Sequence, residues 1–170
     1  MTVYKTVFDV TEAGWQTWPM PALGLSMIAA GFFLLLKKKA SSRLAVAFLC
    51  FAFLWTGLTG WFTYGEYHAV RLAIAEGRTK FTEGIVERFT PMPKSGHALE
   101  SFCIGGRCFT YSDFVVTTGF NNAASHGGPM KNGMKARVTY VGIDHAVKLR
   151  NVIIKLEIED KDKKEKEDKK

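Results

Sequence analysis

The chain has 170 residues, of which 47% are hydrophobic and 23% are charged, and its formal net charge is +7. These averages hide two long stretches without any charge, residues 13–36 and 44–65, and a fully charged end, residues 159–170. About ninety residues of mixed polarity remain, enough for one small domain. The composition therefore excludes a purely soluble enzyme with a large buried cleft.

The N-terminal segment, residues 1–17, precedes two apolar segments that are long enough to cross a bilayer. As helices, residues 18–36 would span roughly 28 Å and residues 44–65 roughly 33 Å, against a hydrocarbon core of about 30 Å. Backbone in lipid must satisfy its own hydrogen bonds, so we predict a transmembrane helical hairpin over residues 18–65. The alternative is a pair of buried core helices, but the remaining domain is too small to cover them. A cleaved signal peptide is not expected, because the cations follow the first apolar segment instead of preceding it.

The connection between the two apolar segments, residues 37–43, is strongly basic. It carries four cations, whereas residues 1–17 carry a single one; the four are Lys37, Lys38, Lys39 and Arg43. The positive-inside rule places such a loop in the cytoplasm and both termini on the other side. We therefore expect a bacterial inner (cytoplasmic) membrane protein whose two termini are both extracytoplasmic.

Small residues recur at every fourth position in both apolar segments. They are Ala22, Ser26 and Ala30 in the first, and Ala52, Thr56 and Gly60 in the second. Such stripes let helix backbones approach closely in lipid, so we expect the two stripes to face each other. The alternative is that small residues are simply common in membrane helices.

A change of pattern follows the second apolar segment. Residues 66–79 read as a juxtamembrane helix that stops at Gly77, and residues 80–158 read as a β domain. Five strands are predicted there, over residues 81–90, 100–104, 107–112, 135–141 and 147–158. We expect a small five-stranded β-barrel of the OB or SH3-like type, with a compact sandwich as the alternative, which makes the whole chain an α+β membrane protein.

Cys103 and Cys108 are the sharpest chemical feature of the β domain. Gly105 and Gly106 favour a two-residue hairpin turn, and in that register Cys103 lies directly opposite Cys108. Opposite residues are about 4.5–5.5 Å apart, within disulfide range, and an extracytoplasmic domain lies in an oxidising compartment. We predict a structural disulfide. A redox pair or a metal site that adds His126 remains an alternative, although the Cys-x4-Cys spacing fits neither well.

The long segment after the hairpin, residues 113–133, is the candidate binding loop. Long irregular loops in small domains tend to be functional. The residues singled out for binding are Tyr111, Asp113, Phe120, Asn121, Asn122 and His126. The alternative is structural: the Asn and Gly residues supply turns, and Phe120 fills the core. The chain has no recognisable nucleophile–base pair, paired carboxylates or phosphate-binding loop, so we expect no enzymatic activity, cofactor or metal.

The charged end, residues 159–170, contains six cations and six anions and is expected to be a solvated, disordered tail. Outside the basic connection, the remaining cations are dispersed along the chain. A nucleic-acid partner would need a concentrated basic face with stacking aromatic residues. We therefore expect no nucleic-acid binding.

Several short motifs of residues 80–158 resemble those of small bacterial two-span inner-membrane proteins of unknown function. They are Glu100-Ser101-Phe102, Phe109-Thr110-Tyr111-Ser112-Asp113, Gly119-Phe120-Asn121, His126-Gly127-Gly128-Pro129 and Gly133-Met134-Lys135-Ala136-Arg137-Val138. The architecture is also loosely similar to membrane-anchored OB domains of the NfeD type, which act as partners of membrane proteins. The resemblance implies a two-span protein with a β domain and brings no catalytic residues with it.

These observations lead to one expected function and two alternatives. We expect an integral membrane accessory or assembly protein whose β domain contacts another membrane or envelope protein. The first alternative is a thiol-redox or metal-handling envelope protein that uses Cys103 and Cys108. The second is a ligand-sensing membrane module, which would need a concave pocket beneath Phe120.

Overall fold

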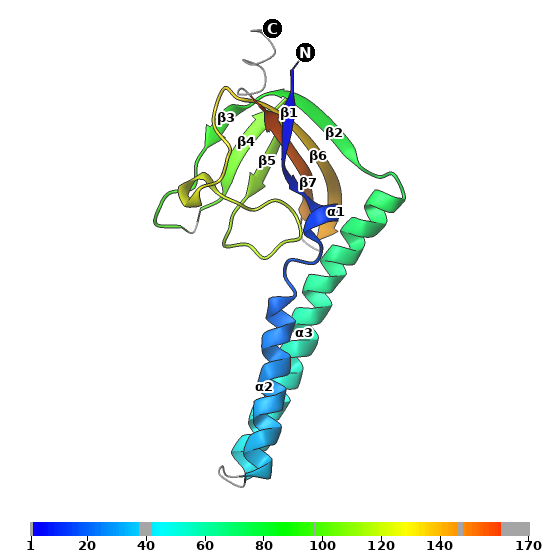
Figure 1. Ribbon diagram of the computed structural model, residues 1–170, viewed down its shortest axis with the longest axis vertical. Helices are drawn as coiled ribbons and strands as arrows, with labels where there is room; N and C mark the ends of the chain where they lie inside the picture. The colour runs from blue at the N-terminus through cyan, green and yellow to red at the C-terminus, as the bar shows by residue number, and fades with distance from the viewer. Residues whose placement is uncertain (1, 38–41, 97, 146–147, 161–170) are drawn as a thin grey trace. The chain divides into compact units, whose positions relative to one another are not determined.

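The computed structural model describes residues 2–37, 42–96, 98–145 and 148–160, and its fold is α+β (Figure 1). The elements in chain order are β1 (Tyr4–Asp9), α1 (Val10–Ala13), α2 (Pro19–Leu36), α3 (Ser42–Ala75), β2 (Lys80–Ile85), β3 (Glu87–Thr90), β4 (Glu100–Ile104), β5 (Arg107–Tyr111), the 3-10 helix η1 (Ala124–His126), β6 (Lys135–His145) and β7 (Lys148–Glu159). The chain forms two compact units. One is Trp15–His68, and the other consists of the described residues of Met1–Gly14 and Ala69–Lys170.

Both long helices are apolar and satisfy their own polar groups. Pro19 begins α2, where a missing backbone N–H costs no helical hydrogen bond. In α3, the hydroxyls of Thr56, Thr59 and Thr63 each donate to the carbonyl four residues earlier, at 2.7 Å. By length and composition, Pro19–Leu36 and Arg43–Ala75 are each able to cross a bilayer, a property that core helices and signal sequences share. Only 17% of each apolar window is buried, however, whereas a core helix is mostly buried.

The two long helices approach each other through residues with small side chains. A Cβ atom added to Gly24 would lie 2.2 Å from Thr56 Oγ1, and one added to Gly31 would lie 2.6 Å from Leu49 Cδ2. Ala52 of α3 is fully buried, and Trp55 donates its ring N–H to the carbonyl of Met20 at 3.4 Å. Only glycine permits this spacing at the two α2 positions.

The predicted small-residue stripes are placed differently on the two helices. In α3, Ala52 and Thr56 lie at the contact, and a Cβ atom on Gly60 would be 3.9 Å from Pro21. In α2, the buried residues are instead Pro21, Gly24 and Gly31, whereas Ser26 and Ala30 are exposed and Ala22 is half-buried. Glycine lets the backbones come closer than alanine or serine does, so the contact lies on the glycine face of α2.

The connection predicted to be cytoplasmic is described only at its ends. Lys37 and Arg43 are exposed, and the Lys37 ammonium lies 5.7 Å from the centroid of the Phe33 ring. Lys38 and Lys39 lie outside the described residues, and so do residues 161–170 of the predicted tail.

The last turns of α3 belong to the β unit and end at a glycine. Val70 and Ala73 are buried and pack in a cluster with Val10 and with residues of β6 and β7. Gly77 has φ +68°, and the N–H of Arg78 donates to the carbonyl of Ala73 at 2.9 Å. This hydrogen-bond pattern ends helices where a residue without a Cβ adopts the left-handed conformation. The helix therefore stops where the sequence suggested it would.

Within the described residues, seven strands form two open antiparallel sheets, in the orders β1-β7-β6-β2 and β3-β4-β5. The prediction of a five-stranded barrel is therefore wrong, because the sheets do not close and the strands number seven among the described residues. The segment predicted as one strand, residues 81–90, is divided at Val86 into β2 and β3, which belong to different sheets. Val86 instead pairs with the turn before β6, since its N–H donates to the carbonyl of Met134 at 2.8 Å.

The space between β5 and β7, which a closed barrel would join, is occupied by part of a loop. Phe120 donates its backbone N–H to the carbonyl of Ile153 at 2.9 Å. A Cβ atom added to Gly119 would lie 2.4 Å from Val152 Cγ1, so this loop contacts β7 closely. A loop N–H thus satisfies a β7 carbonyl that a neighbouring strand would satisfy in a closed barrel.

The N-terminal segment contributes a strand that the sequence analysis did not assign. β1 pairs antiparallel with β7, with Tyr4 opposite Glu159 and Asp9 opposite Lys155. The Tyr4 hydroxyl donates to Glu83 of β2 at 2.8 Å, and the guanidinium of Arg137 lies 3.9 Å from the centroid of the Tyr4 ring. These contacts link β1, β2 and β6 of this sheet.

The hairpin between β4 and β5 has the predicted register. Phe102 lies opposite Phe109, and Cys103 lies opposite Cys108. The two sulfur atoms are 2.03 Å apart, which is disulfide distance, so the predicted pairing is confirmed. The side chains of Phe102 and Phe109 face the core of the β unit.

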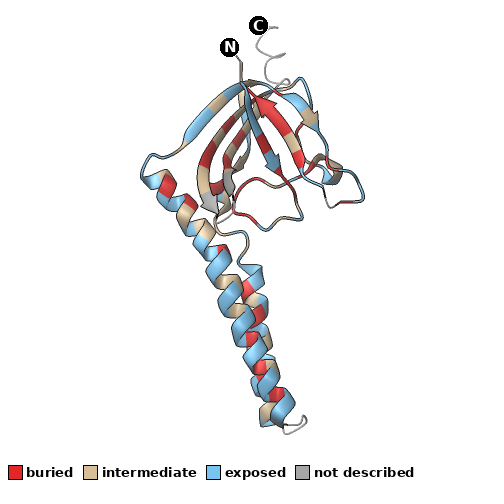
Figure 2. Cartoon of the chain, turned by 180° about the vertical axis from the view of Figure 1, so that it is seen from behind, coloured by how far each residue is buried: buried red, intermediate tan, exposed pale blue. Residues whose placement is uncertain are grey.

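The core of the β unit lies mainly between the two sheets. Its largest buried side chains come from β4, β5, β6, β7 and the long loops, and Figure 2 shows the buried residues along the strands. They include Phe102, Ile104, Phe109, Tyr111, Phe120, Met130, Val138 and Leu156. Burying each such side chain contributes roughly 1.5–3 kcal/mol relative to exposure.

Candidate functional site

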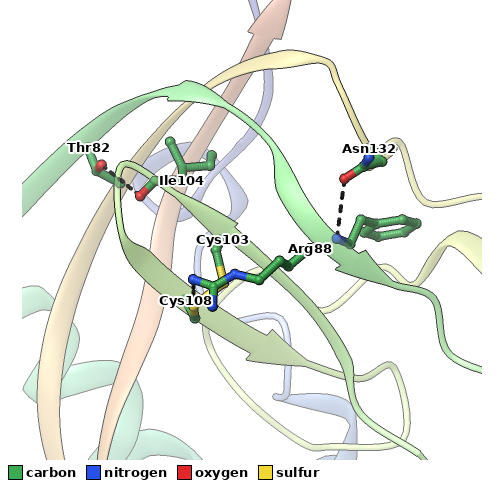
Figure 3. The surroundings of a disulfide bond; sticks show 7 residues. Thr82, Arg88, Cys103, Ile104, Cys108 and Asn132 are labelled. Atoms are coloured by element: carbon green, nitrogen blue, oxygen red, sulfur yellow. Dashed lines mark hydrogen bonds between the residues drawn. A yellow bond between two sulfur atoms is a disulfide. The ribbon is translucent and has the colours of Figure 1, made fainter.

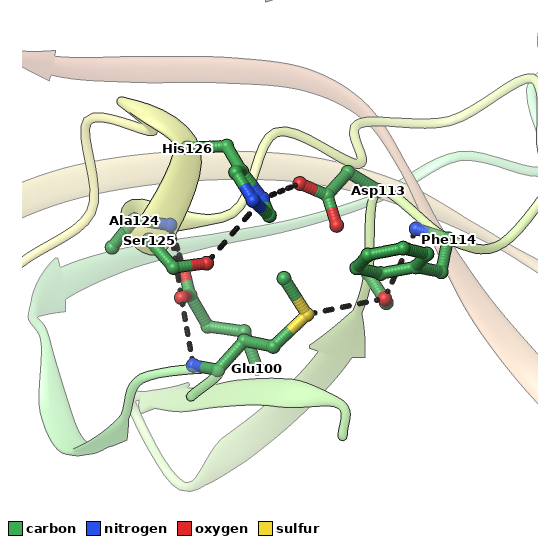
Figure 4. Close-up of polar contacts among 8 residues, drawn as sticks. Glu100, Asp113, Phe114, Ala124, Ser125 and His126 are labelled. Atoms are coloured by element: carbon green, nitrogen blue, oxygen red, sulfur yellow. Dashed lines mark hydrogen bonds and ion pairs between the residues drawn. The ribbon is translucent and has the colours of Figure 1, made fainter. Parts of the chain in front are cut away.

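A fully buried carboxylate, that of Glu100 at the start of β4, links the two long loops of the β unit (Figure 4). It accepts the backbone N–H of Met92, from the loop between β3 and β4, at 3.2 Å. It also accepts the backbone N–H of Ala124, from the loop between β5 and β6, at 2.9 Å. The hydroxyl of Tyr111 donates to it as well. Every one of these neighbours is a donor, so the carboxylate oxygens act only as acceptors here.

The tyrosine of this cluster cannot act as an acid near neutral pH. Burial raises the pKa of Tyr111, and its hydrogen bond to Glu100 raises that pKa further. The hydroxyl therefore stays protonated and keeps donating to the carboxylate. Its role in this arrangement is to hold Glu100.

The beginning of the second long loop is fixed by a buried serine. The hydroxyl of Ser112 lies 3.5 Å from the sulfur of Met92 and accepts the backbone N–H of Phe114 at 3.2 Å. Ser112 and Glu100 together connect the loop between β3 and β4 to the loop between β5 and β6 through buried contacts. The loop predicted to be functional is thus held by buried polar contacts at two points.

His126 and Asp113 form an ion pair or hydrogen bond at the surface of this loop. Asp113 Oδ2 contacts His126 Nδ1, and the hydroxyl of Ser125 lies 3.5 Å from the same ring nitrogen (Figure 4). A Ser-His-Asp triad places the serine on Nε2 and the carboxylate on Nδ1. Because both groups here face Nδ1, the imidazole cannot relay a proton between them. The arrangement orders the loop and does not activate Ser125.

Three exposed apolar side chains lie on the two loops that Glu100 connects. Leu99, Phe114 and Val116 are 54%, 56% and 45% exposed. The Phe114 ring packs over Gly96, where an added Cβ atom would lie 2.7 Å from it, and its centroid lies 6.0 Å from that of His126. Phe114 is therefore held in place by its packing although its ring is exposed.

The predicted binding residues divide into two groups. Tyr111 and Phe120 are buried, 1% and 5% exposed, and belong to the core cluster. Asp113 and Asn121 are half-buried, and Asn122 and His126 are exposed. The structure brings Asp113 and His126 into contact and leaves only part of the predicted set accessible to a partner.

Sequence reasoning missed the residue that organises this site, Glu100. It is in phase with Phe102 and Ile104, and all three side chains are fully buried. A period of two along a strand places alternate residues on the same face, so the position was readable from the sequence. Its charge concealed it, because ionised side chains are almost never buried without partners.

The disulfide hairpin has one notable polar contact (Figure 3). An N–H of the Arg88 guanidinium donates to Cys108 Sγ at 3.6 Å. Close by, Thr82 donates to the carbonyl of Ile104 at 3.3 Å, which connects β2 to the end of β4. Free Cys50, the third cysteine, lies in α3 and is exposed.

The structure bears on the metal and ligand alternatives as well. Among the residues that it describes, no group of three or more His, Cys, Asp or Glu side chains is arranged to hold a metal ion; His97 lies outside them. A hollow lined by Tyr111, Gly119, Phe120 and Val152 has a volume of about 10 Å³. That volume holds about one water molecule and no larger ligand.

No protein-family model, curated protein or solved structure matches the chain.

Proposed function

We propose that this chain is an integral membrane accessory or assembly protein. Its helical hairpin crosses the bacterial inner membrane, and its β unit contacts another membrane or envelope protein on the extracytoplasmic side. The proposal is for a non-enzymatic role.

The observation that carries the proposal is the position of the helices within the fold. Both apolar helices lie between β1 and β2 in the chain, yet β1 pairs with β7 in the sheet that also contains β2. Strands of one sheet must lie on the same side of a membrane, so the intervening chain crosses it an even number of times. Two crossings fit two helices of spanning length. Cleavage after α2, as in a signal peptide, would remove a strand from the sheet.

The proposed orientation has two supports that do not depend on each other. Cys103 and Cys108 are at disulfide distance, and disulfides persist in oxidising compartments such as the bacterial periplasm. Lys37 and Arg43 flank the connection between α2 and α3, and cations concentrate in cytoplasmic loops. Both support a topology with the β unit outside and the connection inside.

The proposed contact surface is the apolar one formed by Leu99, Phe114 and Val116. Its loops are held by Glu100 and Ser112, so little conformational entropy is lost when a partner binds. The geometry at His126 supports binding over catalysis, because Asp113 and Ser125 share one ring nitrogen.

A first experiment tests anchoring and orientation. We expect a reporter fused after Lys170 to be active only outside the cytoplasm, and mass spectrometry of the mature protein to recover a peptide containing Tyr4–Asp9. A mature chain that lacks β1 would contradict retention of α2. Reporter activity confined to the cytosol would contradict the orientation.

A second experiment tests the contact surface with a matched control. A photo-reactive amino acid is placed at Phe114 or at Phe81, two phenylalanines of similar exposure, 56% and 59%, on different surfaces. We expect a discrete adduct to a membrane or envelope protein from position 114 and none from position 81. Adducts of equal yield at both positions, or turnover of a substrate by the purified protein, would overturn the proposal.

A further inference from the structure

The two cysteines of the hairpin differ in their access to solvent. Cys103 lies on the central strand of its sheet and is only 6% exposed, whereas Cys108 lies on the edge strand β5 and is exposed. A thiol or disulfide reagent approaching from solvent therefore meets the sulfur of Cys108 first.

The charges around the two sulfur atoms also differ. The Arg88 guanidinium contacts Cys108 Sγ at 3.6 Å, and Arg107 precedes Cys108 in β5. Glu87 is the register partner of Cys103 on β3, so an acidic residue occupies the position beside Cys103. A neighbouring cation favours a thiolate, and a carboxylate or burial disfavours it. Reduced Cys108 thus has the more favourable surroundings for a thiolate.

The backbone of Arg88 is unusual in a way that supports this contact. Arg88 has φ +50°, and among the described residues it is the only one other than glycine with positive φ. A non-glycine residue in this region costs of order 1 kcal/mol and persists only where its surroundings hold it. The conformation occurs at the start of β3, and from there the side chain reaches Cys108.

We propose that Cys108 is the thiol through which the bridge is made, that Cys103 is the resolving thiol, and that Arg88 stabilises the Cys108 thiolate. The oxidant is a disulfide, R–S–S–R. The Cys108 thiolate attacks one of its sulfur atoms, forms a mixed disulfide and releases RS⁻. The Cys103 thiolate then attacks the Cys108 sulfur, forms the Cys103–Cys108 bond and releases the second RS⁻. Two electrons pass to the oxidant, and two protons leave the protein.

The same asymmetry protects the finished bridge. An external thiolate can reach Cys108, but its attack must expel Cys103 as a thiolate into buried surroundings beside Glu87. Poor stabilisation of the leaving thiolate slows exchange. The burial of Cys103 accordingly slows reduction of the finished bridge. This inference rests on the hairpin alone and stands whether or not the proposed accessory role is correct.

The test uses full-length, detergent-solubilised protein in which Cys50 is replaced (Cys50→Ala), reduced and then exposed to oxidised glutathione. Cys103→Ser leaves Cys108 as the reacting thiol, and Cys108→Ser leaves Cys103. We expect the Cys108 thiol to form the glutathione adduct at least about tenfold faster. Arg88→Gln should slow it about threefold, because a pKa rise of one unit cuts the thiolate fraction tenfold while raising nucleophilicity about threefold.

Arg107→Gln is the matched control, since it removes a neighbouring cation for which no contact to either sulfur is described. It should change the rate less than Arg88→Gln does. A readout without cysteine substitutions uses the reduced Cys50→Ala protein, quenched early with acid, in which mass spectrometry should find glutathione on Cys108. Glutathione on Cys103, equal rates for the two thiols, or equal effects of the two arginine variants would overturn the proposal.

Discussion

Two carboxylates in the β unit each accept a tyrosine hydroxyl, and their surroundings are opposite. Glu100 accepts from Tyr111 and from backbone amides, and its side chain is fully buried. Glu83 accepts from Tyr4 and from Arg137 Nε, each at 2.8 Å, and its side chain is 38% exposed. Both join segments that are distant in the sequence, β4 to two loops in one case and β1 to β2 and β6 in the other.

The two carboxylates have similar partners and differ in their exposure to water, so a difference between their contributions to stability reflects burial. Water can replace every partner of Glu83, so breaking those contacts exposes no unsatisfied group. Water cannot reach the donors around Glu100 without opening the core, so losing that carboxylate leaves buried N–H groups unpaired. We therefore expect the buried contact to control the stability of the loops, although both have similar partners.

The largest effect is expected for Glu100→Gln. The amide oxygen can take the place of Oε2 and keep the N–H groups of Met92 and Ala124, but the N–H₂ group then replaces Oε1, which accepts the Tyr111 hydroxyl, and the charge that strengthens all of these bonds is lost. We expect a loss of about 2–4 kcal/mol in the free energy of opening of residues 91–99 and 112–134. Native-state hydrogen exchange at the Ala124 amide measures it. Unchanged protection there would contradict the role given to Glu100.

A smaller effect is expected from the same chemical change at two tyrosines. Tyr111→Phe removes a buried donor to a carboxylate and should cost about 1–3 kcal/mol. Tyr4→Phe keeps the ring over Arg137 and removes a hydrogen bond accessible to solvent, so it should cost less than about 0.5 kcal/mol. Thermal unfolding of the two variants in the same detergent gives the comparison, and equal losses would refute it.

The smallest effect is expected for Glu83→Gln, and it should depend on pH. Hydrogen bonds from Arg137 and then Tyr4 lower the pKa of Glu83 below its ordinary value of 4.5. A lowered folded-state pKa stabilises the protein fully above the ordinary value, and that contribution disappears as the pH falls through the folded-state pKa. The stability difference between wild type and Glu83→Gln should therefore shrink on acidification from pH 7. A difference that grows at low pH would show that Glu83 is not paired in this way.

The helix contact offers an independent comparison between two glycines. A Cβ atom on Gly24 would meet Thr56, whereas one on Gly57 would meet nothing within 4 Å. Gly24→Ala should destabilise the helix pair by about 1–3 kcal/mol, and Gly57→Ala should be neutral or slightly stabilising. Thermal unfolding of the two variants in detergent measures this, and the reverse order would mean that the helices pack through another face.

Local signals in the sequence were sufficient for the helices and for the hairpin. Gly105 and Gly106 fix a two-residue turn, and with the turn fixed the opposition of Cys103 and Cys108 follows from strand geometry. The stop at Gly77 is local in the same sense, because it depends on the backbone freedom of a single residue.

The features that escaped prediction depend on contacts distant in the sequence. Tyr4–Asp9 is short and half-exposed, and its partner strand lies at the other end of the chain. The sheets do not close, because the backbone of a loop residue, Phe120, bonds to β7 where a strand would otherwise pair. No alternating pattern in the sequence predicts such a loop contact. Glu100 is stabilised in the core by backbone N–H groups of two loops. Every residue except proline has such a group, so the sequence does not indicate which ones will bond to Glu100.

In the proposed two-span topology, the pairing of β1 with β7 makes completion of the sheet depend on how the chain is inserted into the membrane. β1 is synthesised early and has no sheet partner until β7 has been made. A chain in which only one helix had crossed would hold these strands on opposite sides of the lipid, with the β7 edge uncovered. Such an unpaired edge is a template for pairing with another chain. A misinserted molecule would therefore differ from a correctly inserted one by an exposed edge of β7.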